Sequence, residues 1–172
     1  MSLEIDGLVT ARHTDLVLER MAAHVGEELR TIGALTFEAA AADDSPVGRA
    51  VFEAYLHHVR TVGLFLGTAA SRAWPDDVVA DDYFETPGRT FEPLSADDRR
   101  DIDGRLARLT VERLLPEASQ LTGDRSYWGR RVLKKFDLFV ETLRAESPER
   151  AMWFEAALTD AKRSAVPHRT AS

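Results

Sequence analysis

The stretch SPVGRAVFEAYLHHVRTVGLFLG, residues 45–67, carries a strong helix signal. Ser45 can accept a hydrogen bond from a first-turn N–H group, and Pro46 suits the first helical position. Gly67 suits the end of the helix. Apolar side chains recur at steps of three and four, which predicts one buried face. The members of that predicted face are Val47, Val51, Ala54, Tyr55, His58, Val62 and Phe65.

Four further segments on either side share this helical period. The first follows Thr14 as N-cap, a second follows Ser95 within a capping box, and the last follows Ser147 and Pro148. Strand-like alternation of useful length is absent from the sequence. We therefore predict an all-α helical bundle of about five main helices. The apolar positions that define the four segments are Leu18, Met21, Ala22, Val25, Leu29 and Ile32; Ile102, Leu106, Leu109 and Leu114; Trp128, Val132, Phe136, Phe139, Val140 and Leu143; and Met152, Trp153, Ala156 and Ala157.

Residues 68–94 separate the second and third predicted helices. Pro75, Pro87, Gly88 and Pro93 interrupt any periodicity there. A connection of this length in a compact domain is usually a functional loop or a packed cover. We expect it to be ordered, with a short helix within residues 76–84.

The composition limits the possible functions. The chain has 172 residues, 22 Lys and Arg against 29 Asp and Glu, a net charge of −7, and no Cys. This length fits a single helical domain, residues 1–172, with short flexible N- and C-terminal ends. Disulfides, thiolate catalysis and Cys-ligated metals are excluded, and the negative charge argues against broad nucleic-acid binding. Acidic residues near the N-terminus and the short apolar runs favour a cytoplasmic protein without a membrane span.

Three groups of residues could carry chemistry. His57 and His58 are adjacent in a predicted helix, so they cannot both face one spot, and His57 lies one turn from Glu53. Their simpler interpretation is a core or interface histidine beside a surface pair. The acidic segment Asp76–Asp82 could bind a divalent cation, but acids at a helix start also favour the helix dipole.

The third group is basic and comprises Arg130, Arg131, Lys134 and Lys135, with Tyr127 and Trp128 nearby. Together they could hold phosphate and stack a base. The alternative is that Trp128 is a core residue and the charges form the solvated face of an amphipathic helix. No metal site and no cofactor is expected, since no Glu-x-x-His, phosphate-binding loop or dinucleotide fingerprint occurs in the sequence.

Three segments in order resemble the HEPN-like helical proteins of bacteria. Residues 52–66 resemble their H-x-R-x-L-x-x-F helix, with Val62 where Leu is preferred. Residues 76–83 resemble the D-D-V-x-A-x-D-F/Y loop that follows. Residues 103–113 resemble the next helix, N-K-x-L-A-H-L-T-x-x-R. The resemblance covers about half of the chain, and the order of the motifs is more specific than any one of them.

The resemblance implies a homodimeric helical bundle, often a metal-independent ribonuclease of phage defence or a toxin–antitoxin system. In such enzymes an Arg holds phosphate and a His four to six residues later moves protons. This chain departs from the pattern at that point, because Arg108 stands where the His is expected and Asp103 where the Asn is expected. Arg cannot exchange a proton near neutral pH.

The candidate site is therefore His58, Arg60, Asp103 and Arg108, with no catalytic assignment. The sequence favours a non-catalytic, homodimeric interaction module with a protein, RNA or nucleotide partner. The alternative is a divergent metal-independent ribonuclease that uses His57 or His58 with Arg60. Adjacent Trp153 and Phe154 on the last helix are also hard to bury together in one bundle, which favours the homodimer.

Overall fold

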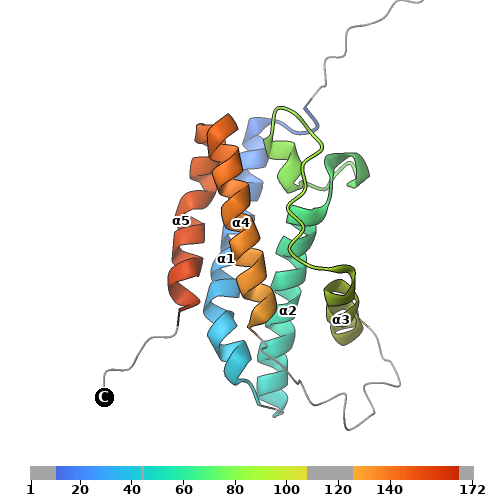
Figure 1. Cartoon of the computed structure of the whole chain (residues 1–172), viewed down its shortest axis with the longest axis vertical. Helices are drawn as coiled ribbons and strands as arrows, with labels where there is room; N and C mark the ends of the chain where they lie inside the picture. The colour runs from blue at the N-terminus through green and yellow to red at the C-terminus, as the bar shows by residue number, and fades with distance from the viewer. Residues whose placement is uncertain (1–10, 44, 108–125, 167–172) are drawn as a thin grey trace, which may run out of the picture.

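The computed structural model describes residues 11–43, 45–107 and 126–166. These ranges contain the helices α1 (Asp15–Ala41), α2 (Pro46–Gly67), α3 (Ala96–Ala107), α4 (Tyr127–Glu146) and α5 (Pro148–Ser164) and no strand, which confirms the all-α prediction. Two short 3-10 helices, η1 (Ala70–Arg72) and η2 (Ala80–Tyr83), lie between α2 and α3. Figure 1 shows α1, α2, α4 and α5 running alongside one another, with α3 beside α2.

The helix starts predicted at Thr14, Ser45 and Ser95 are confirmed by side-chain hydrogen bonds, whereas the Ser147 side chain makes no such bond at the start of α5. The Ser45 hydroxyl accepts from the N–H of Gly48 at 3.0 Å, and Pro46 occupies the first turn of α2. Before α3, the Ser95 hydroxyl accepts from the N–H of Asp98 at 3.0 Å, and the Asp98 carboxylate accepts from the N–H of Ser95 at 2.9 Å. These are the two bonds of a capping box, and they satisfy first-turn donors that the helix itself cannot.

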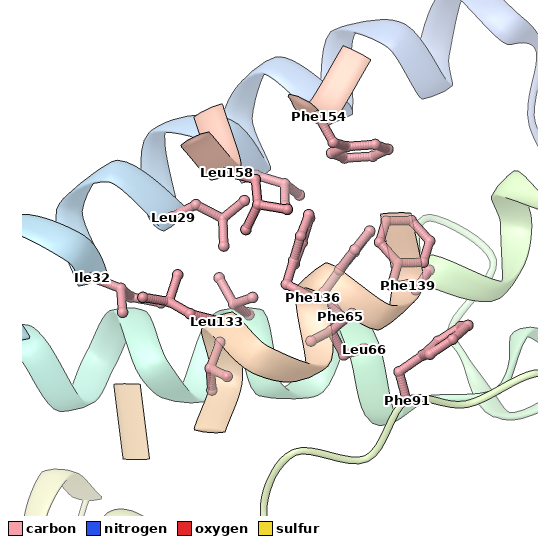
Figure 2. Packing of buried hydrophobic residues seen from close by; sticks show 14 of the residues in the cluster. Leu29, Ile32, Phe65, Leu66, Phe91, Leu133, Phe136, Phe139, Phe154 and Leu158 are labelled. Atoms are coloured by element: carbon pink, nitrogen blue, oxygen red, sulfur yellow. The ribbon is translucent and has the colours of Figure 1, made fainter. Parts of the chain in front are cut away.

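Aromatic side chains fill the middle of the bundle. Phe136, Phe139 and Phe154 are fully buried, and the ring of Phe139 lies 5.2 Å from each of the other two. Figure 2 shows these rings together with Phe65 of α2 and the aliphatic residues Leu29 and Leu158. Edge-to-face ring contacts of this kind add to the stabilisation from burial alone.

The connection between α2 and α3 is ordered and covers one end of the bundle. Tyr83 is fully buried and donates its hydroxyl to the carbonyl of Leu18 at 2.8 Å. The buried Asp81 carboxylate accepts from the N–H groups of Ala70, Gly88 and Arg89 at 2.8–2.9 Å. The ordered connection is therefore confirmed. The short helix expected within residues 76–84 is the 3-10 helix η2, and η1 adds a second helical turn.

The buried face of α2 differs in part from the predicted one: Tyr55, Val62 and Phe65 are buried as predicted, and other members are not. Val47 is 73% exposed, Ala54 is exposed, and His58 lies at the border of the buried face. α2 is apolar on most of its circumference, so the spacing of its apolar residues is compatible with burial of either of two faces. The bundle buries the side that carries the largest rings. That buried side consists of Phe52, Tyr55, Leu56, Val59, Val62, Phe65 and Leu66.

The buried face of α5 also differs from the predicted one. Met152 is 63% exposed and Ala156 is exposed, whereas Phe154 is fully buried. Trp153 is partly buried, and its ring lies 6.3 Å from that of Tyr83, a residue of the α2–α3 connection. A single chain therefore accommodates both Trp153 and Phe154, so the prediction that they are hard to bury together in one bundle is wrong.

Candidate functional site

Arg60 of α2 and Asp103 of α3 meet at a small pocket between their helices. Arg60 Nε donates to Asp103 Oδ1 at 2.5 Å, and both side chains are 44% exposed. Arg99 of α3 forms a second ion pair with Glu92 beside them. The pocket itself has a volume of about 30 Å³, room for one water molecule. Small-molecule sites need roughly 300–1,000 Å³, so this pocket is too small for a substrate.

His58 points to the other side of α2. Its Nδ1 lies 2.6 Å from Glu28 Oε2 of α1, and the two side chains are 26% and 31% exposed. Analysis of the sequence did not identify Glu28 as the partner. Only the antiparallel packing of α1 on α2 brings these residues together, and no local pattern marks it.

Of the two predicted histidine–arginine pairs, His58 and Arg60 do not converge. Residues two apart on a helix point about 160° from each other, and His58 and Arg60 accordingly contact opposite neighbours, α1 and α3. His57 is exposed and stands three residues from Arg60, so these two share one face. Arg108 lies outside the described residues. Of the predicted candidate site, the structure thus brings together only Arg60 and Asp103.

Asp98 at the start of α3 joins α3 to α4, a role that the sequence did not reveal. Its carboxylate accepts from Trp128 Nε1 at 2.9 Å and from Arg131 at 3.0 Å, in addition to its cap to Ser95. Burial acts to raise the pKa of Asp98, but the bonds from Ser95, Trp128 and Arg131 outweigh it and hold the pKa below its usual value. Asp98 is therefore a charged structural link.

The predicted basic patch is divided between two sides of α4. Arg131 is held by Asp98 and by the Tyr127 hydroxyl, at 2.7 Å, and stacks over the Tyr127 ring. Arg130 and Lys134 are exposed, and Lys135 is partly buried. Trp128 packs against the core and uses its indole N–H for Asp98, so it has no free face prepared for a base.

The acidic segment is used to build the connection. Asp81 binds three backbone N–H groups, and Asp82 accepts from Arg12 at 3.2 Å and from the N–H of Val79 at 2.9 Å. Asp77 accepts from the N–H of Trp74 at 3.2 Å. Across residues 11–43, 45–107 and 126–166, no three His, Asp or Glu side chains gather where they could hold a metal ion.

Two further observations concern the chain as a whole. None of the helices in the described ranges is both long and apolar enough to cross a bilayer. The comparisons with known proteins found no match among protein families, curated proteins or solved structures. The argument for function therefore rests on the geometry above.

Proposed function

We propose that this chain is a non-catalytic helical interaction module that acts as a homodimer. The observation that carries the proposal is the separate pairing of His58 with Glu28 and of Arg60 with Asp103. A ribonuclease needs a proton-transfer group and a phosphate-binding group directed at one point. Here His58 diverges from Arg60, and each of these two is bound to a carboxylate. His57 shares a face with Arg60, but the Asp103 carboxylate that Arg60 holds would compete with phosphate.

The small volume of the pocket beside Arg60 supports the same proposal. The pocket has room for one water molecule, and Leu64, Leu94 and Ile102 form its apolar walls. A module that works by binding needs surfaces rather than a substrate cavity. The resemblance to HEPN-like proteins adds phage defence or a toxin–antitoxin system as the proposed setting, with a protein, RNA or nucleotide partner.

The test is incubation of purified protein with total RNA and with a labelled single-stranded RNA in the presence of a metal chelator. We expect no cleavage by the wild type. Cleavage that His57→Ala or His58→Ala abolishes would overturn the proposal and support the ribonuclease alternative. The matched control is His24→Ala, because His24 is an exposed histidine of α1 that is not part of the candidate site.

Binding is measured with the same RNA by fluorescence anisotropy. Binding without cleavage that weakens with salt and with Arg108→Ala would identify RNA as the partner. Loss of binding in Lys134→Ala instead would place the RNA on α4. Absence of both binding and cleavage would leave a protein partner.

A further inference from the structure

The outer face of α2 is an uncharged stripe in a highly charged protein. We name it the α2 stripe; its residues are Val47, Ala50, Ala54, His57, Thr61 and Leu64, all exposed. Val47 is 73% and Leu64 is 43% exposed. The exposed faces of the other long helices carry charged side chains among exposed apolar ones such as Phe37, Leu138 and Met152. The charged residues are Arg20, Glu27 and Glu38 on α1, Arg130, Lys134 and Glu141 on α4, and Glu149, Lys162 and Arg163 on α5.

From this stripe we infer that two copies of the chain associate through α2, antiparallel and about a two-fold axis near residue 56. The inference rests on the homodimer of the proposed function and names its surface. The stripe runs from residue 47 to residue 64, so its midpoint lies between residues 55 and 56. Antiparallel pairing about that point sets Val47 against the partner's Leu64 and Ala54 against the partner's His57, and the small Ala50 lets the helix axes approach closely.

The charges beside the stripe agree with the same axis. Glu53 and Arg60 lie on one flank of α2, seven residues apart, and their midpoint is between residues 56 and 57. In an antiparallel pair of helices about a two-fold axis, the same flank of α2 in the two protomers lies on the same side of the interface, so the two copies of that flank face each other. Glu53 of one protomer therefore faces Arg60 of its partner, twice per dimer, in addition to the Asp103 carboxylate that each Arg60 holds within its own protomer. The α2 stripe and the flanking charges thus give two-fold positions that agree within one residue, about 1.5 Å along the helix.

The area of the stripe sets the expected strength of the dimer. A helix of 22 residues is about 33 Å long, and a face roughly 10 Å wide on it covers about 330 Å². Stable interfaces bury roughly 800 Å² per partner, so the flanking surfaces of α1 and α3 must contribute to a tight dimer. We expect a dimer that dissociates on dilution into the micromolar range.

Sedimentation over a range of concentrations tests whether the stripe is the interface. We expect a monomer–dimer equilibrium that Ala54→Arg weakens by at least about a hundredfold, because the substitution places a charge on each side of the same contact. Ala156→Arg, an exposed alanine of α5, is the matched control and leaves the equilibrium unchanged. Circular dichroism confirms that both variants are folded. A monomer at every concentration, or a dimer that Ala54→Arg does not weaken, overturns the inference.

Disulfide trapping tests the register, since the chain has no cysteine of its own. His57→Cys lies next to the two-fold axis and should form a covalent dimer on mild oxidation. Along the helix, residue 47 lies roughly 27 Å from residue 47 of the partner, and residue 64 lies roughly 24 Å from residue 64 of the partner. Neither Val47→Cys nor Leu64→Cys should therefore form a disulfide with its own copy, but a mixture of the two variants should form one between residues 47 and 64. If the protein dimerises but Val47→Cys or Ala156→Cys forms the covalent dimer as efficiently as His57→Cys, the homodimer is supported and the assignment of its interface to α2 is overturned.

Discussion

Replacing Gly33 with Ala tests how closely α1 and α5 approach each other. A Cβ atom at residue 33 would lie 2.6 Å from the Cα and 2.9 Å from the carbonyl carbon of Ala161, and closer still to the carbonyl oxygen of that residue. These are backbone atoms, so no change of rotamer relieves the overlap and the two helices must separate. Overpacking of this kind costs about 3 kcal/mol, at the upper end of its usual range, because the backbone cannot yield.

Alanine also has a better helix propensity than glycine, by about 1 kcal/mol. We therefore expect Gly33→Ala to lower the free energy of unfolding by about 2 kcal/mol. The matched control is Gly104→Ala in α3, where a Cβ atom would meet nothing within 4 Å. The control should gain about 1 kcal/mol from propensity alone.

The assay is urea denaturation followed by circular dichroism, with the slopes of the two variants compared to the wild type. The expected result is a shift of the midpoint in opposite directions, a difference of about 3 kcal/mol between the variants. If Gly33→Ala is as stable as the wild type, or if both variants shift the same way, the backbone contact between α1 and α5 is not what the structure describes.

Three other predictions concern buried polar groups. Asp81→Asn should lower the free energy of unfolding by about 2–4 kcal/mol in urea denaturation, because an amide cannot accept from three backbone N–H groups. The control is Asp76→Asn, which lies at an exposed site and should cost nothing measurable. Burial raises the pKa of Tyr55 to about 12, so the stability that its protonated form contributes is complete below pH 10 and is lost as the pH rises towards 12. Tyr55→Phe should reduce the alkaline loss of stability, to which buried Tyr83, whose pKa burial also raises, contributes as well. The part of the tyrosinate absorbance that Tyr55→Phe removes should appear at higher pH in the folded wild type than in the unfolded chain. The pKa of Asp98 is lowered in the folded state, so its contribution to the free energy of unfolding is present above its unfolded pKa and is lost as the pH falls through its folded pKa. Asp98→Asn should therefore flatten the acid side of a plot of stability against pH. An unchanged acid side would contradict the link from Asp98 to α4.

The sequence by itself determined which segments are helical and where they begin. Capping by Ser45 and Ser95, the position of Pro46 and the apolar period are local properties, and each acts within one or two turns of chain. The ordered connection was also predictable, because a connection of this length in a compact domain is usually a functional loop or a packed cover. These features need no knowledge of what lies across the bundle.

Only the tertiary structure decided which face of α2 is buried and what its polar residues contact. α2 is apolar around most of its circumference, so the choice of face depends on the aromatic residues that α4 and α5 present to it. The partners of His58 and Arg60 are 30 and 43 residues away in the sequence. Such pairs form because packed helices bring charged groups into contact at their flanks, where partial burial favours an ion pair over an isolated charge. For that reason the sequence supplied the members of a candidate site, while the packing of α1 and α3 on α2 directed them apart.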